Sequence, residues 1–394
     1  MLLSLLIYGY TTGTFSSRKI ERATYDSLAF RYIAGNRHPD HDTLAVFRKR
    51  FGKAFQSAFV QVLQIARENQ LSRFGTVSLD GTKIHANASR HSALSYGHAE
   101  KIEAQLQAEV QALLDLAEAA DQSAVPDGVK LPDEIKRRKD RLAAIAAAKV
   151  KIEARAQERF EHEQSDYQAK VAARTAKIEA TGKKPGGKAP QAPVPDPRRA
   201  DDQINLTDEE SRIMKVAGGG FEQCYNAQAV VDTESMLIIA LDVTQATNDK
   251  EQVGPLVAKV QANPAGLNQP ETWLADTGYY SAKNVAICVA ANIAPLIAVK
   301  RDEHHPGWRD RFAEPEPIAD DASPVEVMKH NLKTRAGRAA YALRKQTVEP
   351  VFGIIKSVMG FRQFLLRGLA NVQNEWTLVC LAWNLKRMAA LRLQ

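Results

Sequence analysis

The sequence predicts an α/β fold in which a mixed β-sheet is flanked by helices, with an all-α N-terminal domain and a helical, coiled-coil-like insertion. Three observations predict this organisation. In residues 1–70 the apolar side chains recur every three or four positions, as in amphipathic helices. Residues 98–180 are dense in Ala, Glu, Lys and Gln, which favour helix. After residue 205, strand-like and helix-like segments alternate, which is typical of a mixed sheet covered by helices.

The N-terminal domain, residues 1–70, is expected to contain three helices. The apolar opening segment MLLSLLIYGY predicts a helix with one buried face, which ends at Gly13. A second helix is expected over residues 16–34, and one long amphipathic helix over residues 42–65. Arg48 lies with three other basic residues on the polar side of the long helix. A solvent-exposed face is the simplest interpretation, and contact with DNA is the alternative.

Residues 71–97 are expected to begin the sheet domain, because TVSLDGTKIHA is rich in Val, Thr and Ile. The sequence predicts a strand that ends at Asp80, where Asp80-Gly81 is also a strong signal for a two-residue hairpin turn. A helical hairpin over residues 98–180, turning at residues 126–128, would then interrupt the domain. The Pro-, Gly- and Lys-rich residues 181–204 predict a disordered linker.

Residues 205–394 are expected to complete the sheet domain. YNAQAVVD and MLIIALDV predict two strands joined by a turn, TWLAD a short strand, and APLIAV a buried strand. Helices are expected over residues 250–260 and 282–291, and from about residue 329 to the end. The short strand TWLAD places Asp276 at its carboxyl end, which is where ligands gather in α/β sheets.

The charge of the chain is concentrated in its C-terminal segment. The net charge is +7, with a pI near 9.1, and residues 329–394 hold twelve Lys or Arg against Glu349 and Glu375, a net +10. This distribution favours a polyanionic partner such as nucleic acid. The three cysteines are far apart and form no C-x-x-C pair, which argues against a disulfide framework or zinc ribbon and fits a cytoplasmic protein. The apolar N-terminus is too short to cross a bilayer, so no membrane association is expected.

Three carboxylates could share one chemistry. Asp80 and Asp276 are expected at strand ends, and Glu349 precedes Pro350, which predicts that a helix capped by Thr347 begins there. Converging carboxylates suit Mg²⁺, and two such ions could activate a nucleophile and stabilise the leaving oxygen of a phosphodiester. Taken singly, each residue also has a structural explanation: the two aspartates as turn residues, and the glutamate as a first-turn residue favoured by the helix dipole.

Four segments together resemble bacterial insertion-sequence transposases with a DDE catalytic domain on a ribonuclease H-like fold. SSRKIERATYDSLAFRYIAGNRHPDHDTLAVFRKRF is similar to the N-terminal domain of that family, and SLDGTKIHANAS to its strand with the first Asp. WLADTGYYS is similar to its strand with the second Asp, and YALRKQTVEPVFGIIKSVMGFRQFLLRG to its Glu helix and the basic segment that follows. The resemblance covers nearly the whole chain.

The resemblance implies that Asp80, Asp276 and Glu349 are the catalytic residues and bind two divalent metal ions, Mg²⁺ or Mn²⁺. It implies cleavage at the terminal inverted repeats of the element and transfer of the freed 3′ hydroxyl into target DNA, by a homo-oligomer in the synaptic complex. The expected location is the cytoplasm, in association with the nucleoid. The residues expected to contact DNA are Tyr341, Arg344, Lys345, Lys356, Arg362 and Arg367. The Arg-to-Glu interval is one residue longer than usual in the family, so the Arg role falls to Arg344 or Lys345.

Other functions remain open from the sequence. Family members usually have a further N-terminal stretch, so a truncated or catalytically inactive DNA-binding protein derived from such a transposase is one alternative. A helical DNA-binding or scaffold protein with structural carboxylates is another, and it would bind DNA without Mg²⁺-dependent cutting. Asp276-Thr277-Gly278 is also the triplet of aspartic proteases. However, Asp80 is followed by Gly-Thr, and a protease dyad would need neither the basic segment nor a metal ion.

Overall fold

The structure is a computed structural model, and it describes residues 1–119, 131–183, 186–264, 267, 269–299 and 313–392. The turn expected at residues 126–128 lies outside these ranges. Contacts divide the chain into two compact units. The larger contains Met1–Ala88 and Glu210–Gln394, and the smaller contains Ser89–Glu209.

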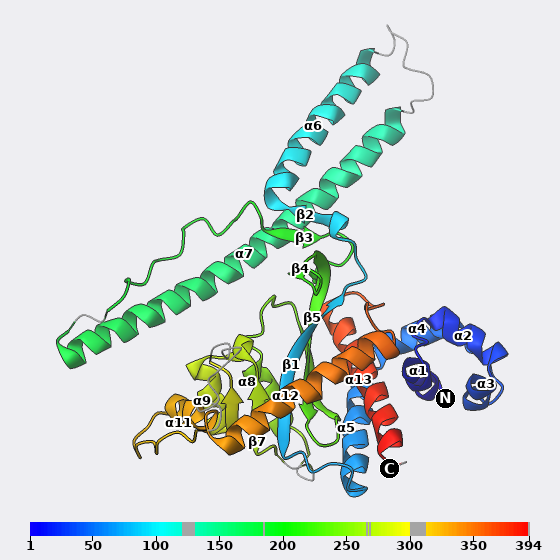
Figure 1. Cartoon of the computed structure of the whole chain (residues 1–394). Coiled ribbons are helices and arrows are strands. Elements are labelled where there is room, and N and C mark those ends of the chain that lie inside the picture. The colour runs from blue at the N-terminus through cyan, green and yellow to red at the C-terminus, as the bar shows by residue number, and fades with distance from the viewer. Residues whose placement is uncertain (120–130, 184–185, 265–266, 268, 300–312, 393–394) are drawn as a thin grey trace. The chain divides into compact units, whose positions relative to one another are not determined.

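The larger unit is built on a mixed six-stranded sheet (Figure 1). Its strands are β1 (Thr76–His85), β4 (Arg212–Lys215), β5 (Phe221–Asp232), β6 (Ile238–Thr244), β7 (Thr272–Ala275) and β8 (Ala294–Ile297). Central strand β1 pairs antiparallel with β5 and parallel with β7, and β7 pairs parallel with β8. β4 and β6 both pair antiparallel with β5. The predicted fold class, a ribonuclease H-like mixed sheet with flanking helices, is confirmed.

Strand β1 does not end at Asp80, so the hairpin predicted there is wrong. Its ladder with β5 continues without a break from Val77, opposite Asp232, to His85, opposite Cys224. Gly81 serves close packing instead of a turn, because a Cβ atom at this position would lie 2.2 Å from Gln228 Nε2. The long-range ladder therefore overrides the local turn signal.

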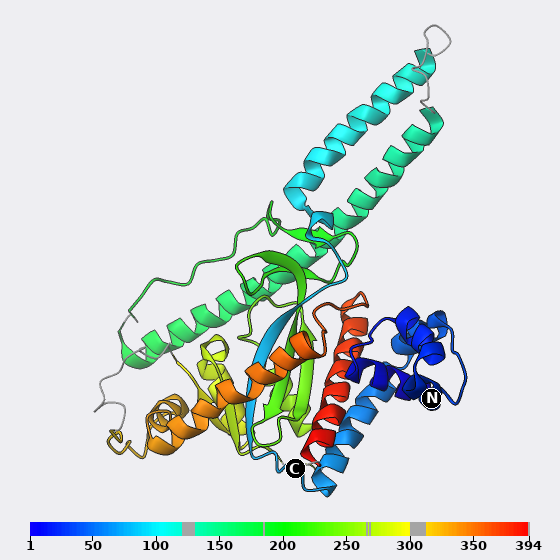
Figure 2. The same cartoon turned by 45° about the vertical axis from the view of Figure 1, so that its right-hand side comes forward.

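Helices cover the sheet and form the N-terminal bundle. They are α1 (Leu2–Thr11), α2 (Ser17–Asp26), α3 (Leu28–Ala34), α4 (His41–Arg50), α5 (Gly52–Glu68), α8 (Val253–Gln261), α9 (Ala282–Ala290), α11 (Pro324–Asn331), α12 (Arg335–Gly353) and α13 (Leu369–Leu391). α5 and α13 lie side by side, and α12 packs against β1 (Figures 1 and 2). One hydrophobic core joins the sheet to the N-terminal helices, with Tyr10, Trp273 and Trp376 fully buried in it.

Two of the N-terminal helices are interrupted where the sequence predicts continuous ones. The backbone of Ser27 is extended, with ψ 125°, and separates α2 from α3. Phe51 likewise separates α4 from α5. The expectation for Arg48 is also wrong, because its side chain is only 6% exposed and reaches Glu375 inside the core. The apolar residues keep a helical spacing across both breaks, so this spacing does not predict where the helices end.

The start predicted for the Glu349 helix is also wrong. α12 begins at Arg335, capped by Thr334, and Pro350 lies inside its last turn. Thr347 is not a cap, since its hydroxyl donates to the carbonyl of Leu343 one turn earlier. Pro350 removes one helical donor, and the chain continues as a short π-helix, η3 (Ile354–Val358).

The smaller unit contains long helices over the residues where the sequence predicts a helical hairpin. Its elements are η1 (Arg90–Ser92), β2 (Ala93–Ser95), α6 (Tyr96–Ala119), α7 (Leu131–Thr181) and β3 (Gln203–Asn205). α6 packs against α7 around a separate apolar cluster that includes Leu106, Ile145 and Ile152. β3 overlaps the end of the segment expected as a linker and pairs with β2. Within the described ranges, no helix is both long and apolar enough to cross a membrane.

Candidate active site

Asp80 lies on β1, and Asp276 directly follows the neighbouring parallel strand β7. Ser78 in β1 pairs with Leu274 in β7, and each aspartate comes two residues later in the chain. The charge of Asp276 acts on the Asp80 carboxyl group, so the two side chains are close to each other. Asp276 is also the cap of the short 3₁₀-helix η2 (Thr277–Tyr279), and its Oδ1 accepts from the backbone N–H of Gly278 at 2.8 Å.

Helix α12 carries Arg344 and Glu349, and Arg344 lies close to both Glu349 and Asp80. The guanidinium of Arg344 lies 3.7 Å from Asp80 Oδ2 and 3.6 Å from Glu349 Oε1. Its side chain is 12% exposed, whereas Lys345 is exposed. Arg344, not Lys345, therefore faces the carboxylates. The two distances exceed hydrogen-bond length, so charge holds the guanidinium there without aligned hydrogen bonds.

The electrostatics of the site oppose ionisation of Asp80. The pKa of Asp80 is raised to about 7: burial is the largest cause and the nearby charges of Asp276 and Asp249 also raise it, whereas the Gly81 N–H and Arg344 lower it. The site therefore carries more negative charge than its own cations neutralise. Such a site gains from binding a further cation.

The three side chains fit a divalent metal ion by chemistry, since all offer hard carboxylate oxygens. Their oxygens are spread wider than 4.8 Å, and Arg344 supplies the positive charge between Asp80 and Glu349. Among the residues that the structure describes, a group of three side chains that could ligate a metal ion consists of Glu21, Asp40 and His41. One ligand atom from each of them lies within 4.8 Å of the others. In that group the imidazole of His41 already pairs with both carboxylates, at 2.7 and 2.9 Å.

The raised pKa of Asp80 predicts that Asp80→Asn stabilises the metal-free protein at pH 8. A carboxyl group with a raised folded pKa contributes stability that is complete below its unfolded pKa of 3.8 and is lost as pH rises through about 7. This loss amounts to up to about 4 kcal/mol between pH 4 and pH 8. Urea unfolding in EDTA should show a higher free energy of unfolding for the variant at pH 8 and equal values near pH 4. A wild-type advantage at pH 8 would contradict the assignment.

The basic residues expected to contact DNA are in different environments. Lys356 is half-buried, and its ammonium donates to the Thr82 hydroxyl and, at 2.9 Å, to the carbonyl of Lys83, so it joins η3 to β1. Burial lowers the pKa of Lys356. Arg362 and Arg367 are exposed, and each uses Nε to donate to a backbone carbonyl, of Lys356 and Asn87 respectively. Tyr341 is half-buried on α12.

Sequence reasoning missed a polar network next to the site. Asp249, in the loop between β6 and α8, accepts hydrogen bonds from Asn226 and Gln228 of β5. The hydroxyl of Tyr279 donates to Gln228 at 2.6 Å. No local pattern marks Asp249, because only the pairing of β5 with β6 and the course of the loop that follows bring it to Asn226 and Gln228.

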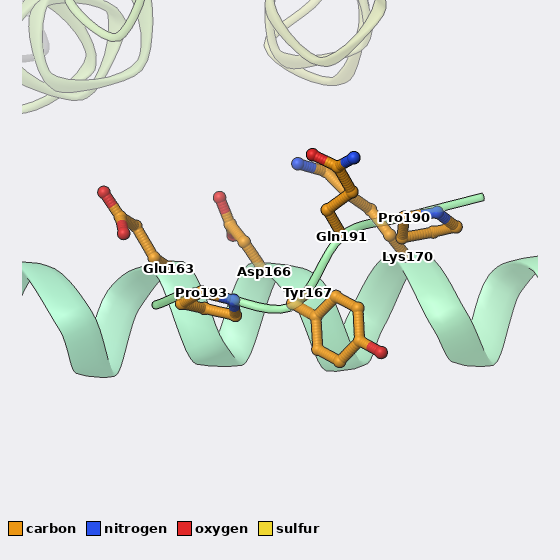
Figure 3. Close-up of a pocket in the computed structure, with 7 residues that line it drawn as sticks. All are labelled: Glu163, Asp166, Tyr167, Lys170, Pro190, Gln191 and Pro193. Carbon is orange, nitrogen blue, oxygen red and sulfur yellow. The ribbon is translucent and has the colours of Figure 1, made fainter. Parts of the chain in front are cut away.

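A surface hollow of about 300 Å³ lies in the smaller unit, beside α7 (Figure 3). Glu163, Tyr167 and Pro190 are among the residues that line it. None of the residues that the sequence predicts to be catalytic or to contact DNA lines this hollow. It adds nothing to the account of the carboxylates.

Two known transposase families match parts of the chain. Residues 193–385 match the transposase DDE domain, a range that includes Asp276 and Glu349. Residues 1–50 match the transposase domain DUF772. No curated protein and no solved structure gives a significant match. The two family matches together take in more than half of the chain, which therefore belongs to the insertion-sequence transposases with a DDE domain.

Proposed function

We propose that the protein cleaves DNA at the ends of its insertion sequence and joins the freed 3′ hydroxyl to target DNA, with Asp80, Asp276 and Glu349 as the catalytic residues. The observation that carries this proposal is the position of Arg344, within 4 Å of both Asp80 and Glu349, while Asp276 follows the strand beside Asp80. Two carboxylates from two separate elements thus flank one largely buried cation, and the third follows the neighbouring strand. A structural role for all three would not require this grouping.

Two divalent ions, Mg²⁺ or Mn²⁺, held by these carboxylates would activate the attacking oxygen and stabilise the leaving oxygen of the phosphodiester. The contribution of the protein is to fix the positions of these carboxylates before the metal ions bind. The ladder around β1 fixes Asp80 next to Asp276, and Lys356 ties the chain after Glu349 to the same strand. Arg344 carries a positive charge that can pair with a DNA phosphate once the carboxylates have another cation.

The proposed substrates are the terminal inverted repeats and a target duplex, bound by a homo-oligomer in the synaptic complex at the nucleoid. The net charge of +10 over residues 329–394 supports binding to the phosphate backbone. Tyr341, Lys345, Arg362 and Arg367 are proposed to contact DNA. Lys356 is proposed to contact it only if its bonds to β1 open.

The proposal is tested with the purified full chain and a labelled duplex that contains one end of the element and its flanking DNA. Strand cleavage at the end is expected with Mg²⁺ or Mn²⁺ and not with EDTA. A duplex with a scrambled end is the matched control. Tight, end-specific binding without cutting in either metal would instead show a DNA-binding protein derived from a transposase.

The exposed arginines should contribute to the salt dependence of DNA binding. The Nε bonds of Arg362 and Arg367 to backbone carbonyls leave the terminal guanidinium nitrogens of each as donors for phosphate. The double variant Arg362→Gln/Arg367→Gln should bind the end duplex more weakly at low salt. The slope of log K against log salt should fall by about 1.8, at 0.9 per lost phosphate contact.

The matched control for this titration is Arg22→Gln, which changes an exposed arginine paired with Asp26 in the N-terminal bundle. The comparison needs titrations of all three proteins at several salt concentrations without metal. An unchanged slope in the double variant, with an unchanged melting temperature, would show that these arginines only aid solubility.

A further inference from the structure

A buried polar network lies behind β1, on the face opposite the carboxylates. Successive residues of a strand point to opposite faces, so Gly81 and Lys83 face away from Asp80. Asn226 and Gln228 pair with Lys83 and Gly81 in the ladder and share their face. Asp249 completes the network from the loop before α8, with its Oδ1 3.5 Å from Lys83 Nζ.

The hydrogen bonds of this network fix the orientation of one amide. Asp249 Oδ1 accepts from Asn226 Nδ2 at 2.6 Å and from Gln228 Nε2 at 2.8 Å. A carboxylate only accepts, so the NH₂ group of Gln228 must face Asp249 and its Oε1 must point away. That oxygen accepts from the hydroxyl of Tyr279 at 2.6 Å. Both Gln228 and Tyr279 are fully buried.

Tyr279 connects the network to a catalytic residue. It is the last residue of η2, which Asp276 caps, and its backbone N–H donates to the carbonyl of Asp276 at 3.2 Å. Asn284 of α9 adds a second link, since its Nδ2 donates to the carbonyls of both Lys250 and Tyr279. The loop that carries Asp249 and the turn that carries Asp276 are thus joined twice.

The network also packs closely against the backbone of Gly81, directly after Asp80. A Cβ atom on Gly81 would lie 2.2 Å from Gln228 Nε2 and 2.8 Å from Asp249 Oδ1. The glycine after Asp80 therefore makes room for the bonds that begin at Asp249. One network thus contacts Gly81, directly after Asp80, and includes Tyr279, three residues after Asp276.

We propose that Asp249 is a positioning residue of the catalytic site, which holds the backbone of Asp276 in register with that of Asp80 through Gln228 and Tyr279. The proposal rests on the proposed function. In this role Asp249 acts on the site indirectly, by keeping Gln228 turned toward Tyr279. Loss of this contact should let the turn after β7 shift, which widens the space between the two aspartates.

The test compares Asp249→Ala, Tyr279→Phe and the double variant with the wild type in the end-cleavage assay. Each single variant should lower the cleavage rate about 10- to 100-fold and raise the Mg²⁺ concentration for half-maximal rate, as loss of an outer-shell partner does. The double variant should be little worse than Asp249→Ala, since both changes break one chain of bonds. Asp249→Asn keeps an acceptor oxygen and should recover part of the rate.

The matched control is Asp242→Ala on strand β6, which removes another carboxylate that pairs with a lysine, Lys259 of α8. It should leave the Mg²⁺ dependence unchanged. Binding of the end duplex without metal should be unaffected in all variants. A dependence on Mg²⁺ identical to that of the wild type in Tyr279→Phe, which removes a single oxygen, would overturn the inference even if Asp249→Ala fails to fold.

The assay separates the inference from the proposed function. If the wild type cuts the end duplex and the single variants match it, only the positioning role fails. Strictly additive losses in the double variant would also contradict a shared chain of bonds. If the wild type neither cuts DNA nor binds Mn²⁺ in a direct titration, the proposed function fails and the positioning role fails with it.

Discussion

Replacing Glu375 by alanine is expected to lower the free energy of unfolding by about 3–5 kcal/mol, because it leaves a buried charge without its partner. Glu375 is 1% exposed, and its Oε1 lies 2.8 Å from the hydroxyl of Tyr10 and 3.8 Å from Arg48. Its Oε2 accepts from the backbone N–H groups of Leu365 and Leu366, both at 2.9 Å. One carboxylate thus joins α13, the N-terminal helices and the segment after η3.

Urea unfolding of the full chain measures this effect. Arg22→Ala is the matched control, because it breaks an ion pair with Asp26 that is exposed on both sides and should change stability little. The double variant Arg48→Met/Glu375→Leu should recover much of the loss, since it leaves no unpaired buried charge. Equal stability of Glu375→Ala and the wild type would show that the N-terminal helices do not depend on this contact.

Asp80→Asn, Asp276→Asn and Glu349→Gln are each expected to lower the rate of strand cleavage by at least about a thousandfold. Each change removes a charged ligand at nearly constant shape, and the metal ions contribute several kcal/mol to stabilising the transition state. Binding of the end duplex should persist, because the basic surface is unchanged. Single-turnover cleavage with saturating Mg²⁺ measures the loss directly.

The control for these three variants is Asp242→Asn, a carboxylate on β6 that is only 15% exposed and pairs with Lys259. Its cleavage rate should equal that of the wild type. A folded Asp276→Asn protein that cuts at the wild-type rate would remove Asp276 from the proposed site. The same result for Glu349→Gln would make the proximity of α12 to β1 purely structural.

Much of the fold follows from patterns that the sequence carries locally. The strands β5, β6, β7 and β8 lie where apolar and β-branched runs predict them, and Asp276 directly follows β7 as expected. These elements are short and bounded by turn residues, so local signals suffice. The alternation of strands and helices after residue 205 likewise predicts the mixed sheet.

The errors arise where long-range contacts outweigh local preference. Asp80-Gly81 has the composition of a turn, yet β5 holds both residues inside a strand. Pro350 favours a helix start, but α12 tolerates it one turn from its end. The burial of Arg48 depends on Glu375, more than 300 residues later in the chain, so no window of sequence could indicate it. The role inferred for Asp249 has the same origin.

The central claim is that Asp276 binds a divalent metal ion for strand cleavage, and a change of metal preference in Asp276→Cys tests it most directly. A thiolate is a softer ligand than a carboxylate and binds Mn²⁺ better than Mg²⁺. The variant should fail to cut the end duplex in Mg²⁺ and regain cleavage in Mn²⁺, while the wild type cuts in both. Equal cleavage by the variant in Mg²⁺ and Mn²⁺, at the wild-type rate, would contradict the account.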